Sequence, residues 1–92
     1  MRKLWSNKSW EDYLYWQTQD KRTLRRINRL LKELERSGVD TDGQRVPIGK
    51  AEKLKYSKVG LSSVRIDESN RLVYKIEDDD TLSIVSCRGH YR

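Results

Sequence analysis

The last third of the chain contains two strand patterns close enough to pair as a β-hairpin. Apolar positions recur in segments 72–76 and 82–87, and the acidic turn 77–80 joins them. Successive side chains of a strand point to opposite faces, so the first segment turns three apolar side chains to one face: Leu72, Tyr74 and Ile76. Arg71, Val73 and Lys75 then share the other face. Since burial of an arginine is costly, we expect Arg71 to look outward.

The first part of the chain has two helix patterns. Ser6 precedes apolar residues at helical spacing, which predicts a capped helix that runs to about Gln19. Asp20 has the position of a second N-cap, and Gly38 that of a terminating glycine. The apolar residues of the second helix recur every three or four positions: Leu24, Ile27, Leu30, Leu31 and Leu34.

These elements predict an α+β fold, with a mainly antiparallel sheet of about four strands and two N-terminal helices packed on one face. Segment 2–5 is a short edge-like strand, segment 52–56 could begin a strand, and segment 61–66 should be one. We expect residues 1–92 to form a single domain. The chain has no apolar run near the roughly 18 residues of a membrane span and no signal-peptide stretch, so we expect no membrane partner and a cytoplasmic location.

Basic residues dominate the charge pattern, and the formal net charge is +6. One group lies on the second predicted helix: Lys21, Arg22, Arg25, Arg26, Arg29 and Lys32. The other surrounds a single acid, Glu52, and includes Lys50, Lys53, Lys55 and Lys58, which we expect to contact RNA. Charge alone does not distinguish a nucleic acid from an acidic protein.

The remaining chemical groups suit cleavage of a phosphodiester by acid-base catalysis. A phosphate-cradling glycine loop and a dinucleotide fingerprint are missing from the sequence, and one histidine with one cysteine cannot supply a usual transition-metal set, so we expect no cofactor. The single Cys87 is expected to be a small buried hydrophobe. The candidates for catalysis are Glu52 as base, Arg65 and Arg71 as phosphate ligands, His90 as acid and Tyr91 as a stacking or orienting group.

Each candidate also has a simpler interpretation. Glu52 could be a solvated partner of the neighbouring lysines, and Arg65 an edge-strand charge that discourages aggregation. Arg71 could be an ordinary exposed strand residue. His90 could lie on a frayed tail.

Four stretches of the sequence resemble the YoeB/Txe branch of the RelE superfamily of toxin-antitoxin ribonucleases. They are WEDYLYWQTQDKRTLRRINRLLKELERSG, GKAEKLK, VRIDESNRLVYKIEDD and IVSCRGHY. The resemblance implies a small α+β toxin that enters the ribosomal A site, cuts mRNA there and is silenced by a cognate antitoxin; a homodimer is possible. It places the base on Glu52, the phosphate-binding cations on Lys55, Arg65 and Arg71, and the terminal pair on His90 and Tyr91.

The chain departs from this pattern at five positions. Val64 stands where relatives usually have a basic residue, and Ser62 where an aromatic is common. The others are Asn70 for histidine, Gly89 for tyrosine and the additional Arg92. Two alternatives stay open: a basic module that occludes a ribosomal or DNA site without cleaving, and a gyrase poison of the ParE type.

Overall fold

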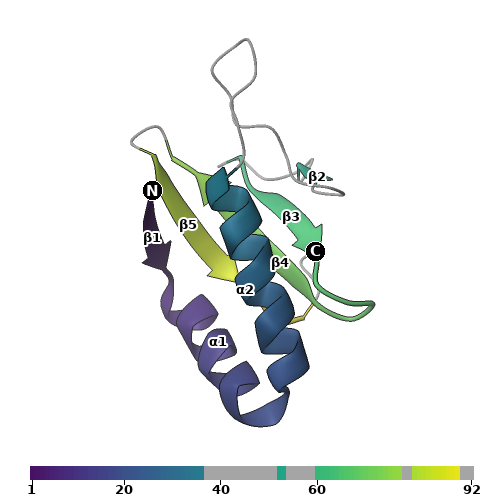
Figure 1. The fold of residues 1–92 in the computed structure, drawn as a ribbon. Coiled ribbons are helices and arrows are strands. Elements are labelled where there is room, and N and C mark those ends of the chain that lie inside the picture. The colour runs from purple at the N-terminus through teal and green to yellow at the C-terminus, as the bar shows by residue number, and fades with distance from the viewer. Residues whose placement is uncertain (37–51, 54–59, 78–79, 90–92) are drawn as a thin grey trace.

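The computed structural model describes residues 1–36, 52–53, 60–77 and 80–89, which form one sheet with two helices on it (Figure 1). The elements in chain order are β1 (Arg2–Trp5), α1 (Asn7–Gln19), α2 (Lys21–Arg36), β2 (Glu52–Lys53), β3 (Ser62–Arg65), β4 (Arg71–Ile76) and β5 (Thr81–Ser86). The sheet has the order β1-β5-β4-β3-β2. The predicted α+β class is confirmed, and the two-residue β2 makes the sheet five-stranded.

Both helices begin where the sequence predicts. The Ser6 hydroxyl accepts the N–H of Ser9 at 3.0 Å and caps α1. Asp20 accepts the N–H groups of Arg22 and Thr23 and caps α2. Neither helix is long and apolar enough to cross a membrane. The predicted end of the second helix at Gly38, and the loop that follows it, lie outside the described residues.

The sheet is antiparallel except at one edge. β3, β4 and β5 pair antiparallel in sequence order, as the hairpin pattern predicts, and β2 pairs antiparallel with β3. β1 pairs parallel with β5, in register Arg2 to Thr81. Of the predicted strand 52–56, residues 52–53 are a strand, and residues 54–56 lie outside the described part.

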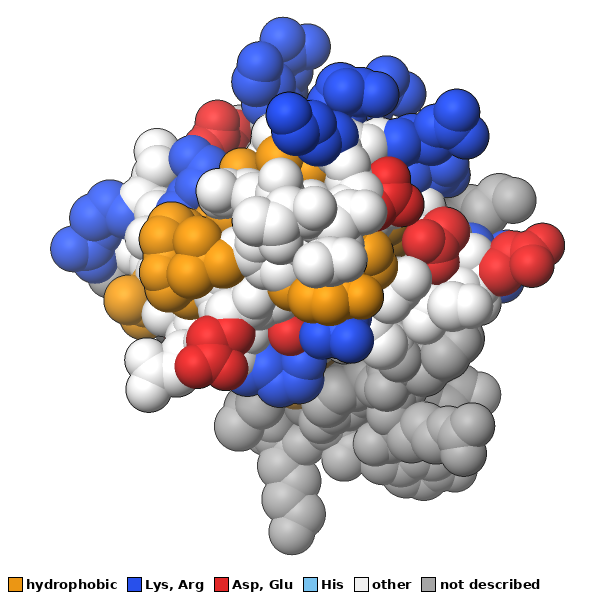
Figure 2. Space-filling view, turned by 90° about the horizontal axis from the view of Figure 1, so that it is seen from below, with side chains coloured by type: hydrophobic (Ala, Val, Ile, Leu, Met, Phe, Trp, Pro, Cys, Tyr) orange, Lys and Arg blue, Asp and Glu red, His pale blue; other side chains and the backbone are white. Residues whose placement is uncertain are grey.

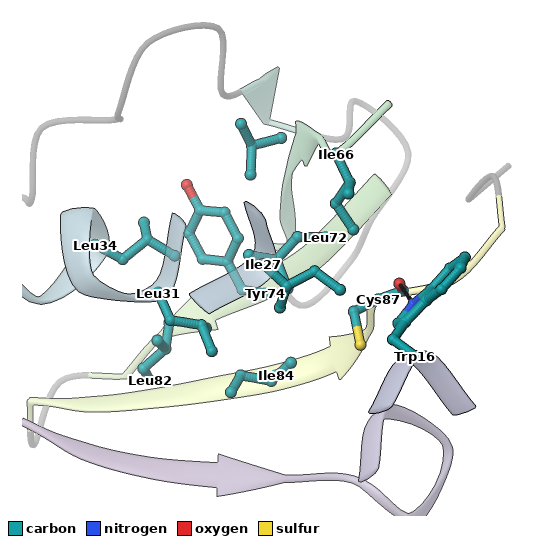
Figure 3. Packing of buried hydrophobic residues seen from close by; sticks show 11 residues of the cluster. Trp16, Ile27, Leu31, Leu34, Ile66, Leu72, Tyr74, Leu82, Ile84 and Cys87 are labelled. Carbon is teal, nitrogen blue, oxygen red and sulfur yellow. Dashed lines mark hydrogen bonds between the residues drawn. The ribbon is translucent and has the colours of Figure 1, made fainter. Parts of the chain in front are cut away.

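The core lies between α2 and the sheet (Figure 3). The apolar stripe of α2 meets buried residues of the two central strands, namely Ile27, Leu31 and Leu34 on the helix and Leu72, Tyr74, Leu82 and Ile84 on the sheet. The predicted inward face of β4 is therefore confirmed. Val73, on the other face, is also fully buried, which alternation alone did not indicate.

A break in register between β4 and β5 brings Cys87 into this core. Tyr74 pairs with Ile84, but its neighbour Val73 pairs with Ser86, so Val85 is an extra residue on β5. Such a bulge shifts the alternation of a strand by one position. Ile84 and Cys87 consequently face the same side although they are three residues apart, and the predicted burial of Cys87 is confirmed.

A buried carboxylate joins α1 to the segment that follows β5. Asp12 is only 6% exposed, and its Oδ2 accepts the backbone N–H of Cys87 at 3.0 Å. Lys8, one turn earlier, donates to both carboxylate oxygens at 2.8 Å. A buried N–H group without an acceptor is costly, so Asp12 is expected to stabilise this junction.

We predict that Asp12→Ala lowers the free energy of unfolding by about 2 kcal/mol, because it leaves the buried Cys87 N–H without an acceptor. Asp12→Asn keeps a carbonyl oxygen for that N–H and loses only the ion pair with an exposed lysine, so its cost should be below about 1 kcal/mol. Urea denaturation measures both, with exposed Glu11→Ala as control. Equal losses for the two Asp12 variants would contradict this role.

Candidate active site

Two arginines lie opposite each other on the sheet face that points away from the helices. Arg65 of β3 and Arg71 of β4 are register partners. Their neighbours Val64 and Leu72 point into the core, so alternation sends both arginines to the other face. Directly opposed residues of an antiparallel pair have Cβ atoms about 5 Å apart, which is close enough for both guanidinium groups to reach one phosphate.

A buried serine fixes the direction of Arg71. Its Nε donates to Ser63 Oγ at 3.1 Å, and Ser63 is fully buried two residues before Arg65. Arg65 is exposed and Arg71 is half-buried. The prediction that Arg71 lies on the face away from the core is confirmed, but its side chain is partly covered. A guanidinium held through Nε keeps its two terminal nitrogens directed together, which suits bidentate binding of a phosphate.

The backbone pairing places Glu52 in the same cross-strand row of the sheet as Ser63. Glu52 is the register partner of Ser63, and Ser63 is in turn the partner of Val73. The candidate base is thus attached to the chain directly across from the serine that orients Arg71. The predicted RNA contacts Lys50, Lys55 and Lys58 lie outside the described residues, and Lys53 is described only as part of β2.

The last described residue is fixed beside Arg71. The Arg71 N–H donates to the carbonyl of Gly89 at 3.0 Å, and the Gly89 N–H donates to Asn70 Oδ1 at 2.8 Å. His90 and Tyr91 themselves lie outside the described residues. The candidate acid therefore follows directly after a residue whose backbone is bonded to the start of β4.

Residues before Gly89 are held by α1. The Trp16 indole donates to the Cys87 carbonyl at 2.9 Å, and the Arg88 guanidinium lies 3.6 Å from the centre of the Tyr15 ring (Figure 3 shows the first contact).

Sequence reasoning missed the roles of Ser63, Asn70 and Asp12. Only Asn70 had a local signal, because Asp-x-x-Asn before a strand is typical of a hydrogen-bonded turn.

Comparison with known proteins places the chain in a family. Residues 5–91 match the sequence model of the YoeB-like toxin of bacterial type II toxin-antitoxin systems. The chain belongs to this family. It is 45% identical to the toxin YoeB of Escherichia coli K12 over 91 residues, which cover 99% of this chain and 100% of that one.

Solved structures of YoeB proteins share the fold. The YoeB dimer from Staphylococcus aureus matches with a TM-score of 0.80 and 41% identity, over 99% of this chain and 98% of that one. YoeB in the heterotetrameric YoeB-YefM toxin-antitoxin complex of the same organism matches with a TM-score of 0.77 and 39% identity, with the same coverage. The resemblance to YoeB proteins that the sequence motifs indicate is therefore confirmed.

The only cysteine of this YoeB-like chain is chemically protected. Burial raises the pKa of the Cys87 thiol to about 12, and the nearby Asp12 carboxylate adds to the increase. The thiol also lies 3.7 Å from the Ser9 carbonyl, to which it donates. At pH 8 the thiolate is therefore a minor form, on the order of one part in ten thousand.

We predict that Ellman's reagent labels Cys87 of the folded protein at least about 100-fold more slowly than a free thiol at pH 8, because only the thiolate attacks. Labelling in denaturant should reach one equivalent at the ordinary rate. Asp12→Ala, which opens the junction, should speed labelling of the folded protein. Fast labelling of the unmutated protein would contradict the burial of Cys87.

Proposed function

We propose that the protein is a ribosome-dependent mRNA endonuclease, and that it acts in the cytoplasm. The single observation that carries the proposal is the pair Arg65 and Arg71, opposed across β3 and β4, with the backbone of Glu52 on the neighbouring strand and that of Gly89, the residue before His90, bound at the start of β4. Two guanidinium groups on one sheet face suit the two non-bridging oxygens of a phosphodiester. A base and an acid attached on either side suit its cleavage.

In the proposed reaction, a ribose 2′-oxygen attacks the phosphorus and the 5′-oxygen leaves. Glu52 takes the proton of a ribose 2′-hydroxyl, and the 2′-oxygen attacks phosphorus while the bond to the 5′-oxygen breaks. His90 gives its proton to that leaving oxygen, which leaves a 2′,3′-cyclic phosphate on one fragment and a 5′-hydroxyl on the other. Arg65 and Arg71 balance the charge that builds on the phosphate oxygens in the transition state. Tyr91 stacks on a base or orients the phosphate.

The local charge favours RNA. Lys50, Lys53, Lys55 and Lys58 flank Glu52 in the sequence. The same lysines bind the RNA backbone on both sides of the cut.

A second basic surface supports docking on ribosomal RNA. Exposed cations recur along α2 at helical spacing: Arg22, Arg25, Arg26, Arg29, Lys32 and Arg36. Figure 2 views the end of the molecule where α1 meets α2 and shows basic side chains gathered along one edge. We call these six cations of α2 the α2 stripe. Rows of cations of this kind bind phosphate backbones without reading their sequence.

The relatives suggest two protein partners. Staphylococcus aureus YoeB forms a dimer and a heterotetrameric complex with YefM. By analogy we propose that a cognate antitoxin binds and silences this chain, and that the chain forms homodimers. The basic surfaces described above would accept an acidic antitoxin as well as RNA.

Mapping of mRNA ends on programmed ribosomes tests the nuclease. The unmutated protein should produce new ends with 2′,3′-cyclic phosphates, and Glu52→Ala or His90→Gln should each slow cleavage by about 100-fold or more, because each removes a proton-transfer group. Gln17→Ala, at an exposed position of α1 on the other side of the sheet, is the control and should cut normally.

Other results of the same assay would contradict the proposal. Intact message at equal ribosome occupancy would exclude cleavage, and inhibited translation without new ends would indicate a module that only occludes its site. Inhibition of DNA supercoiling with intact message would indicate a gyrase poison. Normal cleavage by both variants would overturn the roles of Glu52 and His90.

We predict that Arg25→Gln with Arg29→Gln weakens ribosome binding, and that the slope of log affinity against log salt falls by about 1 for each phosphate that the protein no longer neutralises. Cleavage at saturating ribosome concentration should stay unchanged, because the α2 stripe lies away from the arginine pair. Filter binding at several salt concentrations measures the slope. Gln17→Ala, at an exposed position of α1, is the control. An unchanged slope in the double variant would rule out the α2 stripe as the docking surface.

A further inference from the structure

The side chain of Asn70 joins two parts of the chain that are far apart in sequence. Its Nδ2 donates to the Asp67 carboxylate, at 3.0 Å from Oδ1 and 3.1 Å from Oδ2. Its Oδ1 accepts the N–H of Gly89 at 2.8 Å. Asn70 thus connects the turn between β3 and β4 with the segment that leads to the C-terminus.

The chemistry of the two partners determines the orientation of this amide. An ionised carboxylate only accepts hydrogen bonds, and a backbone N–H only donates. The NH₂ group must therefore face Asp67, and the carbonyl oxygen must face Gly89. A residue at position 70 needs both a donor and an acceptor to make the two contacts.

Gly89 is held on both of its backbone polar groups by two consecutive residues. Its N–H is bound by Asn70 Oδ1, and its carbonyl by the N–H of Arg71. Gly89 has φ of 89°, in the region that favours glycine, so the chain turns sharply here. A Cβ built on it would meet no atom within 4 Å, so the constraint at this position is the backbone conformation and its hydrogen bonds.

The segment before Gly89 is anchored independently. Asp12 and Trp16 of α1 bind the backbone of Cys87, and Arg88 lies on the Tyr15 ring. Within the described part of the chain, Asn70 supplies the one side-chain hydrogen bond to the residue that immediately precedes His90. Asn70, together with the Arg71 N–H, therefore fixes the backbone of Gly89.

We propose that Asn70 is a positioning residue that fixes the start of the C-terminal tail beside the backbone of Arg71, at the start of β4. This inference rests on the proposed nuclease function, in which His90 must reach the leaving oxygen of a phosphate bound by Arg65 and Arg71. Asn70 touches neither RNA nor the reacting atoms in this role. It acts through Gly89.

Asn70→Ala removes both contacts and leaves the α1 anchors intact. A displacement of a catalytic group by about 1 Å can cost up to about 100-fold in rate. Since the Arg71 bond to Gly89 remains, we expect cleavage at saturating ribosome concentration to fall about 10-fold. The ribosome concentration that gives half the maximal rate should stay within about 2-fold of its value for the unmutated protein, because the arginine pair is unchanged.

A swap of the two side chains separates this role from a general loss of stability. Asn70→Asp alone keeps an acceptor for Gly89 but sets two carboxylates about 3 Å apart, so it should be as slow as Asn70→Ala. Combined with Asp67→Asn, it places a donor at position 67 against an acceptor at position 70 and keeps an acceptor for the Gly89 N–H, and the net charge is conserved. The double variant should cut within about 3-fold of the unmutated protein, which is a large coupling between the two sites.

Amide hydrogen exchange supplies a readout that does not depend on RNA. The Gly89 N–H should exchange faster in Asn70→Ala and Asn70→Asp and recover in the swap, while the amides of β4 and β5 keep their protection. Ser69→Ala, an exposed change in the same turn, is the control and should alter neither exchange nor cleavage.

The outcomes separate the two proposals. If the unmutated protein does not cut mRNA, the nuclease function fails and the positioning role fails with it. If it cuts, and Asn70→Ala cuts equally fast, only the positioning role is overturned, whether or not Gly89 exchange changes. A swap that stays as slow as the single variants would overturn it as well.

Discussion

The rest of the site depends on how residues 87–89 are bound between α1 and the beginning of β4. These residues leave the sheet at the end of β5, where a free strand end would ordinarily fray. On one side Asp12 and Trp16 bind the N–H and the carbonyl of Cys87, and on the other Asn70 and Arg71 bind the N–H and the carbonyl of Gly89. Both ends of this three-residue segment are therefore held by hydrogen bonds from different parts of the chain.

The bulge at Val85 makes this arrangement possible. Without the extra residue, Cys87 would face away from the helices, and Asp12 would have no buried N–H to bind. With it, Cys87 enters the core beside Ser9 and Asp12, and Gly89 is bound at the start of β4 two positions later. One inserted residue thus lets residues 87–89 contact both the core and the start of β4.

The opposed arginines are the element that stability alone does not explain. Like charges directly across a sheet repel, and the pair gains nothing from the core. Arg71 is nevertheless held in place through Ser63 rather than released to solvent. An anion between the two guanidinium groups would offset this repulsion, and the phosphodiester of the proposed function is such an anion.

Local chemistry was sufficient to predict much of the fold and less of the site. Caps, helical spacing and the hairpin pattern located both helices and the central strands, because each signal lies within a few residues of its effect. The contacts of Asp12 with Cys87 and of Asn70 with Gly89 join residues 75 and 19 positions apart, and no local pattern contains them. The structure also reinterprets the departures from the family pattern. Val64 and Ser62 lie on the helix-side face of β3, so a basic residue at either position would not lie on the face that carries Arg65. Asn70 and Gly89, by contrast, are hydrogen-bonded to each other, so these two departures form one unit: the glycine turns the tail, and the asparagine holds the turn.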